Sequence, residues 1–225
     1  MKKINTVIAG TLRREEKKVK IFLIIFFVVG VTGFAIPKTS NFFTHLTPAA
    51  LLLSVAALII FHKPAITLKT SLIFLLIFVL SFLIEAAGVR SGLIFGSYIY
   101  GRGLGLKLID TPLMIGINWL LLVYCTSIIV SSFPVSSILK VLCASAFMVI
   151  YDLVLEQIAP QLDMWEFEGS TPPVRNYVFW MLFAVFFQVI LKLSGIKFQN
   201  RLAAFIFFLQ IAFFLVLLII FKLLK

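Results

Sequence analysis

Residues 202–221 read LAAFIFFLQIAFFLVLLIIF, an apolar run with one polar residue, Gln210. A helix of twenty residues is about 30 Å long, which matches the hydrocarbon thickness of a bilayer. A segment that is apolar all round has no polar face with which to meet water. The run therefore predicts a helix that crosses a membrane.

The same apolar pattern recurs along the whole chain. Including 202–221, the candidate spans lie at 20–36, 46–61, 69–88, 110–131, 138–158, 174–193 and 202–221. The second is short and is bounded by Pro48 and Pro64. The chain is 62% hydrophobic and only 13% charged, whereas a soluble domain carries about 25% charged residues. We predict an all-α protein, a polytopic membrane helix bundle of about seven transmembrane helices, forming a single domain over residues 1–225.

The basic residues indicate an orientation. Lysine and arginine outnumber aspartate and glutamate by 20 to 9, and many of them precede the first span, within residues 1–19 or at Lys20. Positive flanks stay on the cytoplasmic side, so we expect the N-terminus in the cytoplasm of a multi-pass protein of the cell (inner) membrane and, after seven crossings, the C-terminus outside. Anionic membrane lipids are the expected partners of this charge. Nucleic acid is not, because the chain leaves no room for a separate soluble domain.

The acidic residues are unevenly distributed. Glu15 and Glu16 lie among the N-terminal lysines. The other seven fall at the outer ends of spans three to five or in the loop that follows: Glu85, Asp110, Asp152, Glu156, Asp163, Glu166 and Glu168. A carboxylate in hydrocarbon costs several kcal/mol, so it is rarely present without a partner or a task. The crowding of acids at one end favours a functional site there.

Three of these acids are the candidate catalytic residues. Glu85 lies about one turn inside the end of its span, and Asp152 and Glu156 are spaced i, i+4, which places them on one helix face. Two carboxyl groups this close in a poorly hydrated site do not both ionise easily, so one is expected to keep a proton for general acid catalysis. The alternative is that the acids pair with basic residues and only join helices; the candidates for such pairing are Arg90, Arg102, Lys107 and Arg175.

Polar and aromatic residues near the acids complete the predicted site. They are Tyr98, Tyr100, Asn118, Trp119, Trp165, Asn176 and Trp180. The glycine run 101–105 has no predicted strand before it, so we interpret it as a hinge and not as a phosphate-binding loop. Gln188 and Gln210 lie deep in their spans and are expected to form hydrogen bonds between helices.

Metal and cofactor sites are not expected. His45 and His62 flank the second span, and neither has a companion at ligand spacing. A retinal Schiff base would need a lysine within the last span, and the first one occurs at Lys222. Cys125 and Cys143 form no spaced pattern.

The order of these motifs resembles the carotenoid biosynthesis protein family, which includes bisanhydrobacterioruberin hydratase and γ-carotene 1′-hydratase. The resemblance covers roughly residues 80–195. Its segments are EAAGVRSG (85–92), FGSYIY (95–100), LGLK (104–107), TPL (111–113), INW (117–119), YDLVLE (151–156), LDMW (162–165) and NYVFW (176–180). Phe167 stands where many members have a second Trp.

The resemblance implies a hydratase that adds water to the terminal C=C bond of an acyclic carotenoid without a cofactor. Asp152 or Glu85 would donate the proton, and Glu156 would help to keep the donor neutral. Aromatic side chains would stabilise the carbocation, and Asn118, Asn176 and the remaining carboxylate would position the water. Other enzymes of the carotenoid pathway are possible partners.

Three other functions remain open. A carotenoid or prenyl cyclase would begin with the same protonation and exclude water. A prenyl-diphosphate enzyme would use Asp152 and Glu156 as half of a magnesium site, but a second Asp-rich motif is missing. A proton-coupled transporter or lipid-binding protein would place acids along a path, and spans one, two, six and seven lack them.

Overall fold

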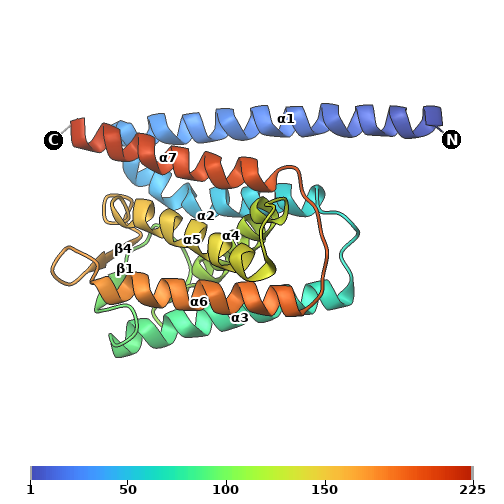
Figure 1. The fold of residues 1–225 in the computed structure, drawn as a ribbon. Helices are drawn as coiled ribbons and strands as arrows, with labels where there is room; N and C mark the ends of the chain where they lie inside the picture. The colour runs from blue at the N-terminus through green and yellow to red at the C-terminus, as the bar shows by residue number, and fades with distance from the viewer. Residues whose placement is uncertain (1, 224–225) are drawn as a thin grey trace.

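A computed structural model describes the fold of residues 2–223 and the side chains of residues 14–223. Within this part of the chain seven helices are long and apolar enough to cross a membrane, which confirms the predicted all-α bundle (Figure 1). The helices are α1 (Lys2–Ala35), α2 (Pro37–Ile60), α3 (Leu68–Ser91), α4 (Leu113–Ser131), α5 (Ser137–Glu156), α6 (Val174–Leu193) and α7 (Ala203–Leu223).

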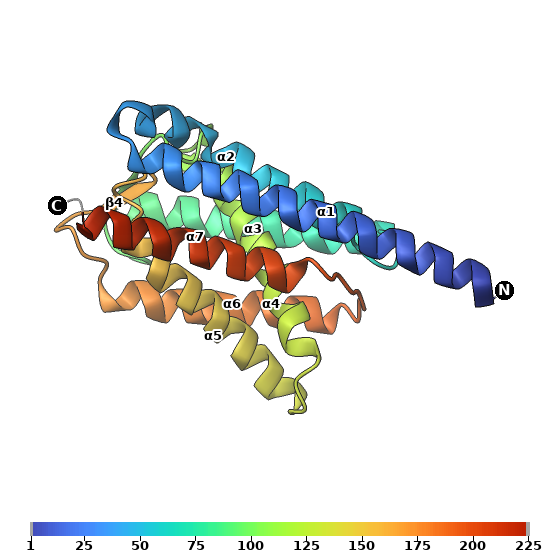
Figure 2. The same ribbon diagram turned by 90° about the horizontal axis from the view of Figure 1, so that it is seen from above.

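Helix α4 is the centre of the bundle. Of its spanning segment 61% is buried, against 22–33% for each of the other six. It packs against α3, α5 and α7, and α1 pairs with α2 and α7 (Figure 2). Its core residues Leu122, Val123 and Cys125 are fully buried. The other helices keep one face apolar and exposed, as expected of helices that meet lipid tails.

The first two helices form a tight hairpin that the sequence predicted less well. Helix α2 begins at Pro37, a position that suits proline because its missing N–H is not needed there. Pro48 lies inside α2 and does not bound it, so the expected short span is a 24-residue helix. Gly33 permits the close approach of α1 to α2, since a Cβ there would lie 2.2 Å from Cε2 of Phe43.

Two long connections at one end of the bundle contain strands that the sequence did not predict. Strand β1 (Tyr98–Tyr100) pairs antiparallel with β4 (Trp165–Phe167), with Tyr98 opposite Phe167 and Tyr100 opposite Trp165. A smaller pair joins β2 (Lys107–Leu108) to β3 (Thr111–Pro112). Because side chains alternate along a strand, all four of those aromatic side chains point inward.

The glycine run is a packing device where a hinge was expected. Strand β1 directly precedes it, and Gly101 and Gly103 donate backbone hydrogen bonds to Met164 O (2.9 Å) and Asp163 O (2.6 Å). A Cβ on Gly101 would lie 2.1 Å from Asp163 Oδ1, and one on Gly103 would lie 2.4 Å from the Leu162 carbonyl oxygen. Glycine is needed here because two backbones run in contact.

The two deep glutamines join helices as expected. Gln188 on α6 donates to the Val123 carbonyl oxygen (3.2 Å) and to Thr126 Oγ1 (2.8 Å) on α4. Gln210 on α7 accepts from Tyr151 on α5 and donates to Ser54 on α2. These bonds fix the helices around α4.

Candidate active site

The three acids that sequence reasoning proposed as catalytic lie in one buried cluster. Glu85 comes from α3, and Asp152 and Glu156 come from α5; their exposed fractions are 3%, 0% and 7%. They line a cavity of about 10 Å³, together with aromatic and polar side chains of β1, β4, α4 and α6. Those other lining residues are Phe95, Tyr98, Tyr100, Ile115, Trp165, Phe167, Asn176 and Trp180. We call this space the acid cavity.

Glu85 is held by aromatic donors. Tyr98 Oη (2.7 Å) and Tyr100 Oη (3.1 Å) donate to its Oε2, and Trp119 Nε1 donates to its Oε1 at 3.0 Å. Burial, more than any charge, raises the pKa of Tyr98 and Tyr100 well above the usual value, so both hydroxyls keep the protons that they donate. Strand β1 is thus the element that orients this carboxyl group.

Asp152 and Glu156 share a donor on α6. Asn176 Nδ2 lies 3.4 Å from Asp152 Oδ2 and 3.1 Å from Glu156 Oε1. Trp165 Nε1 donates to Glu156 Oε2 at 2.9 Å. Asp152 Oδ1 is buried and has no hydrogen-bond partner among the described residues. One carboxyl oxygen in the cluster is therefore free to exchange a proton with a ligand or a water.

Among the described residues, no basic side chain forms an ion pair with the cluster. Every ion pair in the described part of the chain lies elsewhere, and Arg102 pairs with Asp163 at 3.1 Å on the surface. Arg175 donates to the Gly92 carbonyl oxygen, and Lys107 to that of Tyr100. The interpretation that these acids join helices through ion pairs is therefore wrong for Glu85, Asp152 and Glu156. Buried carboxyl groups without a cation cost stability, as functional groups often do.

Aromatic rings enclose the cluster. Trp119 on α4 stacks on Trp180 of α6 with centroids 4.0 Å apart and planes at 17°. Tyr100 meets Tyr98 and Trp165 edge to face, at 5.4 and 6.0 Å. All five of these predicted site residues are buried. Their faces provide electron density next to the acids.

The other four acids near this end do not join the site. Asp110, Glu166 and Glu168 are exposed, and Asp163 is half-exposed in its pair with Arg102. Glu166 points outward because it alternates with Trp165 and Phe167 along β4. Sequence reasoning treated all seven acids as one group because the strand pairing was not visible to it.

Asn118 also lies outside the acid cavity, contrary to the expectation that it holds water beside the acids. Adjacent residues on a helix point about 100° apart. The Trp119 side chain points toward Glu85, to which it donates a hydrogen bond. The Asn118 side chain lines a second cavity of about 190 Å³. The helix period separates these neighbours into different sites.

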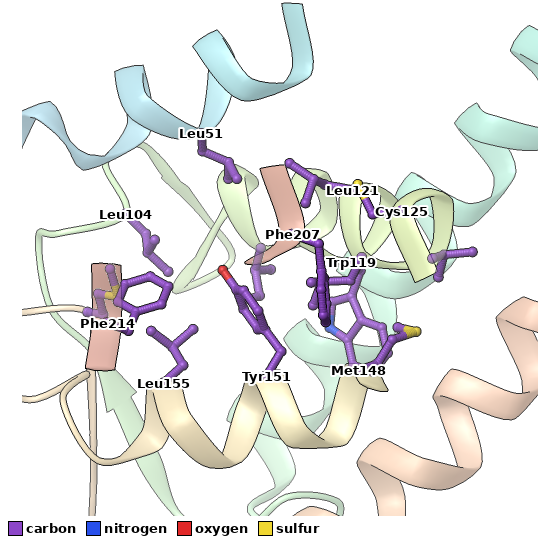
Figure 3. Packing of buried hydrophobic residues seen from close by; sticks show 14 of the residues in the cluster. Leu51, Leu104, Trp119, Leu121, Cys125, Met148, Tyr151, Leu155, Phe207 and Phe214 are labelled. Atoms are coloured by element: carbon purple, nitrogen blue, oxygen red, sulfur yellow. The ribbon is translucent and has the colours of Figure 1, made fainter. Parts of the chain in front are cut away.

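The second cavity is apolar and was not predicted. We call it the apolar cavity; its walls come from α1, α2, α4, α5 and α7, and from Leu104, Met164 and Trp165 of the connecting segments. Figure 3 shows Leu51, Leu104, Tyr151, Leu155 and Phe214, which line it. Its few polar residues are Thr47, Asn118, Tyr151 and Gln210. Sequence reasoning missed it because its lining residues are ordinary members of apolar runs.

The two cavities adjoin. Ile115 and Trp165 line both of them, so these side chains form the wall between the acids and the apolar space. Within the described residues, no group of three or more His, Cys, Asp or Glu side chains is arranged to hold a metal ion.

A family model described as carotenoid biosynthesis protein matches residues 46–224. The chain belongs to the carotenoid biosynthesis protein family. No match was found among curated proteins or solved structures. The match extends beyond residues 80–195 and includes most of α2 and all of the described α7.

The matched region of this carotenoid biosynthesis protein contains every residue of the acid cavity and most of the apolar cavity. Six residues of the apolar cavity fall outside it, five on α1 and one on α2: Phe26, Phe27, Val29, Gly30, Phe34 and Phe43. Membership connects the seven-helix membrane bundle to the biosynthesis of a lipophilic carotenoid.

Proposed function

We propose that this protein is a carotenoid hydratase, which adds water across the terminal C=C bond of an acyclic carotenoid. The observation that carries the proposal is the cluster of three buried carboxyl groups without a cation, beside a cavity of about 10 Å³ and next to a larger apolar cavity. An acid, room for one water and a place for an apolar chain are the three requirements of alkene hydration.

The proton donor is assigned to Asp152. Protonating a trisubstituted alkene requires a neutral carboxylic acid, and a fully buried carboxyl group beside Glu156 is cheaper to keep neutral than charged. Its Oδ1 has no partner among the described residues. The proton adds to the less substituted alkene carbon, and the carbon that bears two methyl groups becomes a tertiary carbocation.

The water belongs in the acid cavity. A single water needs about 10–15 Å³ and two to four polar partners. The cavity has about this volume, and Asp152, Glu156 and Asn176 supply the polar atoms. The water oxygen attacks the cation, and its extra proton returns to the Asp152 carboxylate, directly or through Glu156. The product is a tertiary alcohol, and Asp152 is again the neutral acid.

The aromatic residues stabilise the cation. A desolvated cation over an aromatic face gains about 2 kcal/mol. Trp165 forms part of the wall between the two cavities, and Tyr100 lines the acid cavity and meets Trp165 edge to face. They are therefore the faces that the carbocation meets.

The apolar cavity receives the end of the carotenoid. The acid cavity is too small for an isoprene unit, whereas the apolar cavity has about 190 Å³ and lies behind Ile115 and Trp165. Movement of the Trp165 side chain would join the two. The carotenoid reaches this space from the bilayer, between helices whose outer faces are apolar.

The orientation follows from the basic residues. The N-terminus is assigned to the cytoplasm of the cell membrane. Helix α1 begins and α7 ends at opposite ends of the bundle (Figures 1 and 2). The acid cavity lies at the end away from the start of α1, near the outer face.

The test is expression in a host that makes lycopene, with product analysis by mass spectrometry in ¹⁸O-labelled water. The expected product is heavier than the substrate by one water and carries the label. An isomer of unchanged mass would indicate a cyclase. No new product from several acyclic carotenoids, with the protein folded in the membrane, would overturn the proposal.

A further inference from the structure

A third cavity lies at the opposite end of the bundle from the acids. It has a volume of about 470 Å³ and lies between α4, α5, α6 and the connection to α7. Lys140, Lys192 and Lys197 line it, and so do Ser131 and Ser137. We call it the lysine cavity. None of the described residues that line it is acidic.

The lysine cavity carries an uncompensated positive charge. In the described part of the chain none of its three lysines forms an ion pair. Lys140 Nζ donates to the Ser131 carbonyl oxygen at 2.5 Å, while Lys192 and Lys197 are exposed. At this end the acid Glu16 is already engaged by Lys20 and Arg201.

Helix α5 adds to this charge. It begins at Ser137 in the cavity wall, and the Ser136 side chain caps only the amide of Leu139. The other amides of the first turn and the positive end of the helix dipole would both attract an anion bound in the lysine cavity. The Ser137 hydroxyl lines the same space, whereas the hydroxyls of Ser127 and Ser131 donate to the carbonyl oxygens of Tyr124 and Ile128 within α4.

Part of the remaining wall is apolar, and Gln188 and Gln199 are its other polar residues besides the serines. Ile128, Val141, Leu191 and Phe198 line the cavity beside the lysines. A free phosphate ion gains nothing from contact with these apolar side chains, whereas a phospholipid has acyl chains next to its phosphate that can pack against them. Basic pockets between transmembrane helices on the cytoplasmic side suit such headgroups.

We propose that the lysine cavity binds the phosphate of an anionic phospholipid between α4, α5 and α6. The phosphate oxygens accept hydrogen bonds from Lys140, Lys192 and Lys197 and from the first turn of α5, and the acyl chains lie against the apolar wall. The lipid would hold the α4–α5 hairpin to α6 at the end of the bundle opposite the acid cavity.

The experiment measures lipid binding to the whole protein in detergent, by native mass spectrometry and by the shift in its unfolding temperature. The probes are phosphatidylglycerol, phosphatidylcholine and inorganic phosphate at equal concentration. We expect phosphatidylglycerol alone to raise the unfolding temperature. A basic residue near an anionic lipid changes affinity about fivefold, so Lys140→Gln, Lys192→Gln and Lys197→Gln together should weaken phosphatidylglycerol about 100-fold.

The control replaces Lys17, Lys18 and Lys69 by glutamine, which removes the same charge outside the cavity. This variant should keep its lipid. Equal weakening in both variants, or full binding by the cavity variant, would contradict the proposal. An equal shift with inorganic phosphate would assign the cavity to free phosphate. If the triple variant does not fold, the single variants Lys192→Gln and Lys197→Gln, at exposed positions, are each compared with wild type in the same binding measurement.

Discussion

Asn176 Nδ2 lies within hydrogen-bonding distance of both Asp152 (3.4 Å) and Glu156 (3.1 Å), so one amide group on α6 bridges two carboxyl groups that are one turn apart on α5. The amide nitrogen has two protons to donate, so it can stabilise the charged carboxylate on either Asp152 or Glu156. In the proposed mechanism this bridge connects Asp152, the proposed donor, with Glu156, through which the proton of the water can return to it.

Replacing Asn176 by Leu should reduce hydration about 100-fold or more, because the two carboxyl groups lose their common donor and the water loses a partner. The measurement is the rate of product formation in isolated membranes at a saturating carotenoid concentration. Val178→Leu is the matched control, since Val178 is an exposed residue of α6 that lies outside the acid cavity. Unchanged turnover in folded Asn176→Leu would remove the bridge from the mechanism.

Asp152→Asn should reduce turnover about 10²–10⁴-fold, the usual contribution of a general acid. The unfolding temperature should stay the same or rise, because the change removes a buried carboxyl group that has no cation beside it. Glu166→Gln, an exposed acid of β4, is the control and should behave as wild type. Full activity in folded Asp152→Asn would refute its role as donor.

Ala50→Phe should fill the apolar cavity, because Ala50 lines it on α2. The expected result is a higher KM or loss of turnover, with the acid cavity unaltered. Ala49→Phe places the same ring on the exposed face of the same helix and should leave activity unchanged. Equal activity of the two variants would show that the carotenoid end binds elsewhere.

Alkaline pH should destabilise the protein through Tyr98 and Tyr100. Burial raises the pKa of both hydroxyls well above the ordinary value of 10.0. The two neutral, buried tyrosines contribute their full share of the folding free energy below pH 10, where the hydroxyls are protonated in both states. This contribution is lost as the pH rises toward the folded-state pKa. The unfolding temperature in detergent should therefore fall above pH 10. The double change Tyr98→Phe and Tyr100→Phe should flatten this dependence, and an unaltered slope would contradict the assignment.

The sequence alone determined the class of the protein and the identity of the acids. Composition and run length require membrane helices, because an apolar segment of twenty residues has no other stable position. The pairing of Asp152 with Glu156 also followed from the sequence, since residues four apart on a helix share a face. Both arguments are local and need no knowledge of which helices are neighbours.

Tertiary structure decided what surrounds the acids. Glu85 lines the same cavity as Asp152 only because α3, α4, α5 and α6 pack together, and apolar periodicity does not specify which helices are neighbours. The pairing of β1 with β4 turned two expected loops into an aromatic wall and left Glu166 outside. The apolar cavity needs five helices, and each contributes only ordinary apolar side chains. Long-range packing, which no local pattern encodes, built the site.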